Sequence, residues 1–135
     1  MDSVHQTFIA SLKSWATTQS GIKGILLVGS LARGAGRPES DVDLVIIARD
    51  PQVYLSEIEW AGEFGEISGL QTEDWGQLTS VRVWYQHGLE VEFGFTRETW
   101  IETPLDPGTR KVLAGGFQIL FARSIDFLNL DGLIR

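Results

Sequence analysis

Apolar residues recur at helical spacing near the start of the chain. The positions are Phe8, Ile9, Leu12, Trp15 and Ala16. Steps of three and four residues are typical of a helix with one buried face, so the pattern predicts a helix over residues 3–18. Asp2 or Ser3 can cap its first turn, and Gly21 stands just beyond its end.

Two apolar runs follow, with a glycine-rich turn between them. Residues 23–29 and 41–48 are short and almost wholly apolar, which is typical of buried strands. Residues 31–36 form the turn, which can include one helical turn. Pro51 is suited to the first position of a helix, so we expect a helix over residues 51–61.

Alternation of apolar and polar residues on both sides of a short break predicts a β-hairpin. Val81, Val83 and Tyr85 alternate with Arg82 and Trp84, and Leu89, Val91, Phe93 and Phe95 alternate with Glu90, Glu92 and Gly94. His87 and Gly88 form the break between the two runs. A period of two on each side of a glycine-containing break indicates two antiparallel strands.

The C-terminal part of the chain alternates between loop, helix and strand signals. We expect a loop at 104–108, a short helix at 108–114 ended by two glycines, a strand at 117–122 and a short helix at 125–133. The element order predicts the α/β (α+β) class, with one domain over residues 1–135 and helices packed on a mixed β-sheet.

The charge balance narrows the classes of ligand. The 135-residue chain has a formal net charge of −7 and only 11 lysines and arginines, whereas long nucleic acids are held mainly by such cations. Binding of a long nucleic acid is therefore not expected, but a nucleotide stays open if a metal ion neutralises it. There is no cysteine, no apolar run of membrane-spanning length and no signal-peptide pattern at the start, so the cytoplasm is the expected location.

Asp41 and Asp43 are the first candidate for chemistry. Side chains two residues apart on a strand point to the same face, so these carboxylates should stand side by side with Val42 and Leu44 turned to the core. Like charges at that separation repel, and Mg²⁺ commonly binds one or two carboxylates together with substrate phosphates. An aspartate pair at a strand start is, by itself, also typical of a solvated strand end.

A Gly-Ser pair ends the preceding apolar run. Gly29 lets the backbone approach a ligand closely, and Ser30 offers a hydroxyl and an N–H to phosphate oxygens. Arg33 is near enough to add positive charge. Gly29 and Gly34 have P-loop spacing, but Ala35 and Gly36 stand where that motif requires Lys and Ser or Thr, and the dinucleotide fingerprint is absent.

The combination resembles the nucleotidyltransferase superfamily of polymerase-beta-like fold. The chain reads GSLARG, then PESDVDLVI, and is most similar to minimal and aminoglycoside nucleotidyltransferases over residues 28–47. The resemblance implies a single nucleotidyltransferase domain in which the Gly-Ser turn holds a triphosphate and the strand aspartates bind two Mg²⁺ ions. The expected nucleotide contacts are Gly29, Ser30, Arg33 and Ser40, and the expected metal ligands and catalytic residues are Asp41, Asp43 and Glu92.

Glu92 is the expected third carboxylate, which in this family lies on a later strand. Its neighbours Val91 and Phe93 are apolar, and Glu90 on the same strand face is the rival. The family commonly has aspartate at this position, so glutamate is a departure. Two solvated glutamates on an exposed hairpin face are the alternative interpretation.

The reaction that the resemblance implies is attack on the α-phosphate of a nucleoside triphosphate, with ATP expected, by a hydroxyl acceptor. Relatives that modify antibiotics or tRNA have an additional acceptor-binding domain. An alternative is therefore an antitoxin-type protein of a toxin–antitoxin module, which binds a helical partner protein and modifies it with AMP. A nucleotide-binding module without turnover is the other alternative, although the presence of all three carboxylates favours an enzyme.

Four further residues are less informative than the carboxylates. We expect His5 on the surface of the first helix, His87 in a turn, and Arg82 in a surface ion pair. Trp84, on the polar face of its strand, is the best candidate among the tryptophans for stacking on a base.

Overall fold

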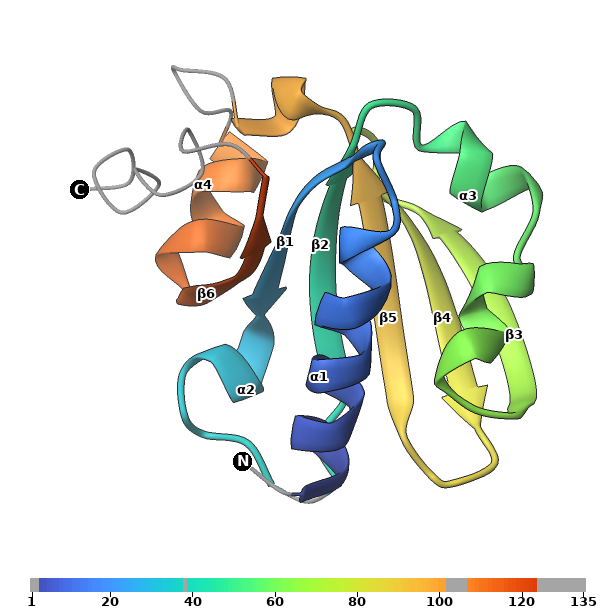
Figure 1. Ribbon diagram of the computed structural model, residues 1–135. Coiled ribbons are helices and arrows are strands. Elements are labelled where there is room, and N and C mark those ends of the chain that lie inside the picture. Colours follow the sequence, from blue (N-terminus) through green and yellow to red (C-terminus); the bar gives the residue numbers. More distant parts are fainter. Residues whose placement is uncertain (1–2, 38, 102–106, 124–135) are drawn as a thin grey trace.

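The computed structural model describes residues 3–37, 39–101 and 107–123. Its helices and strands follow one another along the chain as labelled in Figure 1. They are α1 (Ser3–Thr17), β1 (Ile22–Val28), α2 (Gly29–Ala32), β2 (Val42–Ala48), α3 (Gln52–Ser56), η1 (Glu59–Phe64), β3 (Ile67–Asp74), β4 (Thr79–Tyr85), β5 (Glu90–Thr96), η2 (Glu98–Ile101), α4 (Pro107–Ala114) and β6 (Phe117–Ala122). The prediction of a mixed sheet with packed helices is confirmed.

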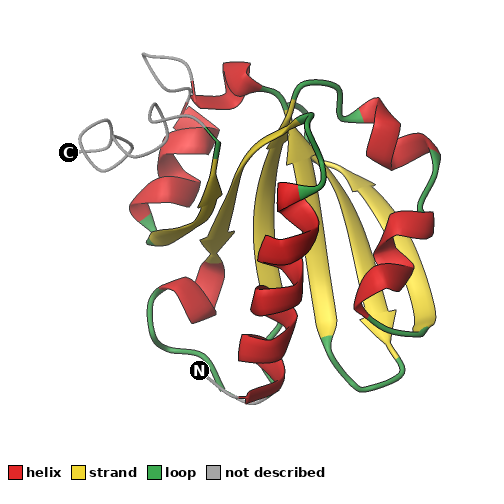
Figure 2. Ribbon diagram, in the orientation of Figure 1, coloured by secondary structure: helices red, strands yellow, loops and turns green. Residues whose placement is uncertain are grey.

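The strands form one sheet in the order β3-β4-β5-β2-β1-β6. The pair β2 and β5 is parallel, and the other neighbours are antiparallel. Strands β4 and β5 are the predicted hairpin, and β5 then crosses back to lie beside β2. This parallel pairing joins the two strands that carry the candidate carboxylates, and helices flank the sheet (Figure 2).

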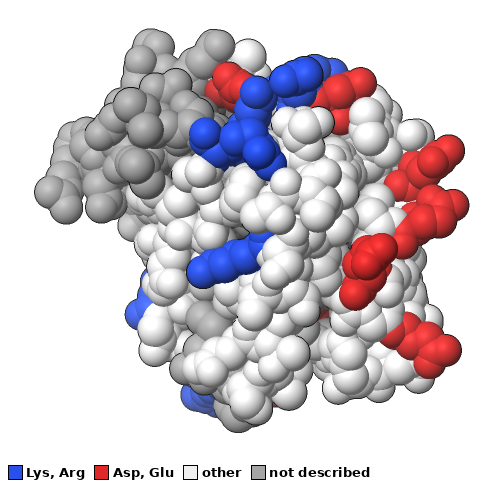
Figure 3. Space-filling model, in the orientation of Figure 1, with Lys and Arg blue, Asp and Glu red and all other residues white. Residues whose placement is uncertain are grey.

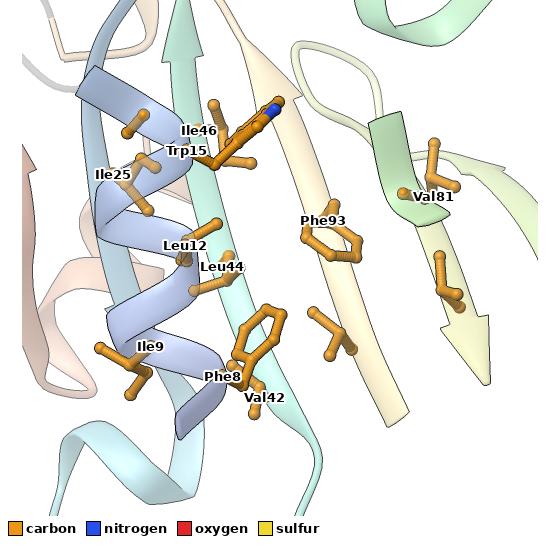
Figure 4. Packing of buried hydrophobic residues seen from close by; sticks show 14 of the residues in the cluster. Phe8, Ile9, Leu12, Trp15, Ile25, Val42, Leu44, Ile46, Val81 and Phe93 are labelled. Carbon is orange, nitrogen blue, oxygen red and sulfur yellow. The ribbon is translucent and has the colours of Figure 1, made fainter. Parts of the chain in front are cut away.

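Helix α1 covers one face of the sheet with the side chains that its period predicts. Phe8, Leu12 and Trp15 point onto β2 and β5, where they meet Leu44 and Phe93 (Figure 4). Each large apolar side chain taken fully out of water stabilises the fold by about 1.5–3 kcal/mol. An aromatic cluster of Trp15, Tyr54, Trp60, Phe64, Phe93 and Phe95 extends this core under α3 and η1.

The described residues cover the opposite face of the sheet only in part. Leu26, Val45 and Ile47 pack there against Trp100 of η2 and Leu113 of α4. Because side chains alternate along a strand, the residues of β2, β4 and β5 that do not face α1 all emerge on this second face. The candidate site therefore lies on the side of the sheet away from α1.

Three expectations from the sequence were wrong. The helix predicted at 51–61 is two short helices, α3 and η1, separated by extended backbone at Glu57. Strand β3 was not predicted, because it is an edge strand whose residues are mostly exposed or half-buried and leave no apolar alternation. His5 is fully buried rather than on the surface.

The other expected elements are found or lie beyond the described residues. The helix and strand expected at 108–114 and 117–122 are α4 and β6. Most of the loop expected at 104–108 and all of the helix expected at 125–133 lie outside the described residues. Among the described helices, none combines the length and apolar character that crossing a bilayer requires. On the face that α1 covers, acidic side chains gather at the edge where α3 and β3 lie (Figure 3).

Candidate functional site

Asp43 lies near the start of β2 and Asp41 immediately precedes the strand, both on the second face of the sheet. Val42 and Leu44 between and after them are buried in the core under α1. Both carboxylates interact with the guanidinium of Arg82, so they occupy one side of the strand. Asp43 is opposite Val28, the last residue of β1, which brings the following turn directly to it.

Gly29 closes that turn against Asp43. Its φ is 77°, a backbone conformation that side chains disfavour, and a Cβ built on Gly29 would overlap Oδ2 of Asp43. Ser30 follows and is half-buried in the first turn of α2. Glycine is thus required here by the approach of the carboxylate as well as by the turn.

Arg33 ends α2 and extends toward the turn between α4 and β6. Its Nη1 donates to the carbonyl of Gly115 at 3.4 Å, and its side chain lies beside Gly116. Arg33 lines the same cleft as Gly29 and Asp43. The structure therefore brings these three predicted residues to one surface.

Strand pairing separates Glu92 from Glu90. Glu92 is directly opposite Asp43 in the parallel β2–β5 pair, and its negative charge raises the pKa of Asp43. Glu90 lies two residues earlier on β5, beside Asp41. Glu92 lines the cleft together with Asp43, so register distinguishes two residues that alternation alone could not.

Arg82 is the cation at the centre of these carboxylates. Its guanidinium contacts Glu92 at 2.9 Å, Glu73 at 3.4 Å and Asp41 at 3.5 Å, and Nη1 also donates to Glu90. Only 21% of the Arg82 side chain is exposed. The predicted surface ion pair is thus a half-buried network drawing acidic residues from β3, β5 and the segment before β2.

One arginine does not neutralise the cluster. Burial, followed by the charges of Glu92 and Asp41, raises the pKa of Asp43 to about 6 although Arg82 acts in the opposite direction. Burial and Glu90 likewise raise the pKa of Asp41. Near neutral pH the site holds more negative charge than its surroundings compensate, and a second cation would be stabilised there.

The donor chemistry fits Mg²⁺, although the side chains are not arranged around an ion. Carboxylate oxygens are the ligands that Mg²⁺ takes in proteins, and the uncompensated charge at Asp43 favours a divalent cation. Within the described ranges, no group of three His, Asp or Glu side chains is arranged to hold a metal ion. The contacts of Arg82 with Asp41 and Glu92 account for this, because they turn both carboxylates toward the guanidinium.

Ser40 and His5 serve the loop that leads into β2. The Ser40 hydroxyl accepts a hydrogen bond from the N–H of Arg37 at 2.8 Å, and the Ser40 carbonyl lies 3.0 Å from Nε2 of His5. Ser40 is not among the residues that line the cleft. The spacing from His5 to Phe8 and Ile9 is helical, so the burial of His5 could have been predicted from the apolar face.

Sequence reasoning missed three residues at the site. Glu73 lies on the unpredicted β3, and Trp75 and Trp100 line the cleft. Trp84, the expected stacking residue, instead donates its indole N–H to Glu90 at 2.9 Å. Trp75 and Trp100 lie in a turn and in a short 3-10 helix, where no sequence period identifies a facing direction.

Comparisons with known proteins concern the sequence family and the fold. A family model described as a nucleotidyltransferase domain matches residues 10–102. The fold is similar to the crystal structure of an aminoglycoside 6-adenyltransferase from Bacillus subtilis, with a TM-score of 0.59 and 14% identity over 74% of this chain and 37% of that one. It is also similar to an apo form of a CCA-adding enzyme, with a TM-score of 0.52 and 13% identity over 98% of this chain and 32% of that one. No protein of curated function matches the sequence.

Proposed function

Because the chain belongs to the nucleotidyltransferase domain family, we propose that it transfers a nucleoside monophosphate from a nucleoside triphosphate to a hydroxyl acceptor, releasing pyrophosphate. ATP is the proposed donor, since one similar structure is named as an adenyltransferase. The observation that carries the proposal is the convergence of Asp43, Glu92 and the Gly29 turn at one end of a single cleft.

Asp41, Asp43 and Glu92 are the residues that would hold two Mg²⁺ ions. The chemistry that bound Mg²⁺ supplies in such a reaction is stabilisation of charge on the attacking and leaving oxygens. Asp41 and Asp43 fit the motif of the resemblance, whereas Glu92 departs from its usual aspartate. The hard oxygen donors and raised pKa values of the aspartates support the assignment.

The remaining roles fall to Gly29 and Arg33, which line the cleft, and to Ser30, which follows Gly29. Gly29 and Ser30 would approach the triphosphate with their N–H groups, and Arg33 would add positive charge. Oε2 of Glu92 now accepts a hydrogen bond from Arg82, and would be available to take the proton of the attacking hydroxyl once that contact loosens. Arg82 is thus a positioning residue that holds the carboxylates together.

The acceptor is not assigned beyond a hydroxyl group. Both similar structures belong to longer chains, of which this chain covers 37% and 32%. The helical partner protein and the toxin–antitoxin role expected from the resemblance stay predictions. Pyrophosphate release measured with a panel of small alcohols, aminoglycosides, tRNA and co-purifying proteins would identify the acceptor class, and ATP binding without any release would indicate a binding module.

Glu92→Gln is expected to lower the rate of pyrophosphate release by about 100-fold or more, because the amide removes a charge beside Asp43 and cannot accept the proton. The matched variant Glu90→Gln is expected to have a much smaller effect, since Glu90 bonds Trp84 and Arg82 and does not line the cleft. Thermal unfolding of both variants checks that each is folded. Loss of activity in Glu90→Gln alone would show that Glu90, and not Glu92, is the third carboxylate.

A further inference from the structure

The cleft continues well beyond the carboxylates. It has a volume of about 640 Å³ and extends from Asp43 and Glu92 along the second face of the sheet. At its far end it is walled by the β3–β4 turn, η2 and α4. Large apolar side chains line it there: Trp75, Leu78 and Trp100. The far end therefore suits an apolar or aromatic group better than a phosphate.

Strand register places the far end of the cleft two residues along β4 and β5 from Glu92, a candidate metal ligand. Glu92 is opposite Arg82, and two residues along the same strands Gly94 is opposite Ser80. Two residues of strand span about 7 Å, comparable to the length of a ribose. Gly94 has no side chain, and the space above it is shared with Leu78, whose Cδ2 would lie 2.8 Å from a Cβ built at that position. Leu78 therefore packs over Gly94, and Ser80 beside it lines the cleft.

Two groups at this end lack the partners that their chemistry demands. Ser80 is fully buried, and its hydroxyl has no hydrogen-bond partner within the described part of the chain. A buried hydroxyl without a partner is unfavourable unless a bound group supplies one. Trp75 leaves 60% of its surface exposed at the rim. A large exposed aromatic ring beside an apolar cleft can stack on a planar group of a bound ligand.

Positive charge lies on the wall nearer the carboxylates. Arg33 and Lys111 both line the cleft, and Nη1 of Arg33 reaches the carbonyl of Gly115 at the end of α4. A ligand with an anionic part at this wall and a flat apolar part toward Trp75 would match both regions. A nucleoside triphosphate has this division.

We propose that the far end of the cleft is the base subsite of the nucleotide, in which Trp75 stacks on the heterocycle and the Ser80 hydroxyl bonds its edge. This inference rests on the proposed function and adds the recognition of the base to it. Helix α4, which forms one wall of the cleft, lies outside the matched residues 10–102, whereas the β3–β4 turn lies within them. Base preference then depends on Trp75 in that turn and on Ser80 of β4.

The test compares ligands with and without a base. Titrations with ATP, GTP, CTP, UTP and inorganic tripolyphosphate, all with Mg²⁺, are followed by calorimetry. Trp75→Ala is expected to weaken binding of the preferred nucleoside triphosphate by about tenfold, the usual effect of losing one stacking ring, and to change tripolyphosphate binding by less than twofold. Trp75 is exposed, so the variant is expected to fold.

Ser80→Ala and a control complete the set. Ser80→Ala removes only the hydroxyl and is expected to narrow the difference in affinity among the four nucleotides while leaving tripolyphosphate unchanged. Leu70→Ala, on the exposed part of β3 and outside the cleft, is expected to behave like the wild type.

The outcomes separate this inference from the proposed function. Wild-type nucleotide affinity and selectivity in both Trp75→Ala and Ser80→Ala would overturn the base subsite, and a raised KM for the acceptor in those variants would assign the far end to the acceptor instead. If wild-type protein binds tripolyphosphate but prefers no nucleotide over it, the base subsite fails while the phosphate site stands. If it binds neither, both proposals fail.

Discussion

Replacing Arg82 by glutamine is expected to lower the free energy of unfolding by about 2 kcal/mol at pH 8 in EDTA. Removing one partner of a buried ion pair costs about 3–5 kcal/mol, and this network is only half-buried, so a smaller loss is expected. The variant leaves Asp41, Glu90 and Glu92 without the cation that now contacts all three. Urea unfolding monitored by tryptophan fluorescence measures the change.

The loss of unfolding free energy in Arg82→Gln should depend on pH and on Mg²⁺. Arg82 lowers the pKa values of Asp41 and Asp43, so its removal raises them further and the native state takes up protons more readily. Native-state proton uptake stabilises the fold as pH falls, so the deficit should shrink between pH 8 and pH 5. Added Mg²⁺ is expected to recover part of it at pH 8.

Arg97→Gln is the matched control. Arg97 pairs with Asp50 at 3.6 Å on the exposed surface, where an ion pair contributes at most about 1 kcal/mol. A loss in Arg82→Gln no larger than in Arg97→Gln, with no response to pH or Mg²⁺, would show that Arg82 does not balance the carboxylates.

Asp43→Asn is expected to abolish pyrophosphate release and at the same time to stabilise the protein. The raised pKa of about 6 means that the ionised form of Asp43 destabilises the fold above that pH. Neutralising it should raise the free energy of unfolding at pH 8 by about 1 kcal/mol, after allowance for solvent screening of a group that is partly exposed.

The gain in stability of Asp43→Asn is expected only over a defined range of pH. Because the folded pKa lies above the unfolded value of 3.8, the native state binds more protons between about pH 4 and pH 6, and wild-type stability falls as pH rises through this range. The advantage of Asp43→Asn should therefore be full above pH 6 and vanish near pH 4. Thermal unfolding across this range measures it, with Glu63→Gln on the exposed side of η1 as the control for loss of one negative charge. An unchanged or lowered stability at pH 8 would contradict the electrostatic account of the site.

Local pattern was enough to predict the frame of the site. Helix α1 and strands β4 and β5 each bury one face, and this leaves a helical period in α1 and an alternation in the strands. Strands β1 and β2 are buried on both faces, which leaves continuous apolar runs. The same alternation predicted that Asp41 and Asp43 share a face, because that geometry depends only on two neighbouring positions of one strand.

Contacts between distant strands leave no period in the sequence, so the sequence favours Glu92 over Glu90 only through its central place in the strand and its larger apolar neighbours. Glu90 and Glu92 share a face, and only the parallel pairing of β5 with β2 sets Glu92 opposite Asp43. The network of Arg82 likewise depends on β3, an edge strand with no buried face to mark it. Trp75 could not be placed, because turn residues have no period.

Titration of ATP into the wild-type protein, once with Mg²⁺ and once in EDTA, tests the central claim most directly. The site is rich in carboxylates and the chain has a net charge of −7, so binding of a multiply charged anion without a metal ion is unfavourable. We expect calorimetry to detect ATP binding with Mg²⁺, and to detect none in EDTA or in Asp43→Asn. Equal affinity with Mg²⁺ and in EDTA, or wild-type affinity in Asp43→Asn, would contradict a metal-dependent nucleotidyltransferase site at these residues.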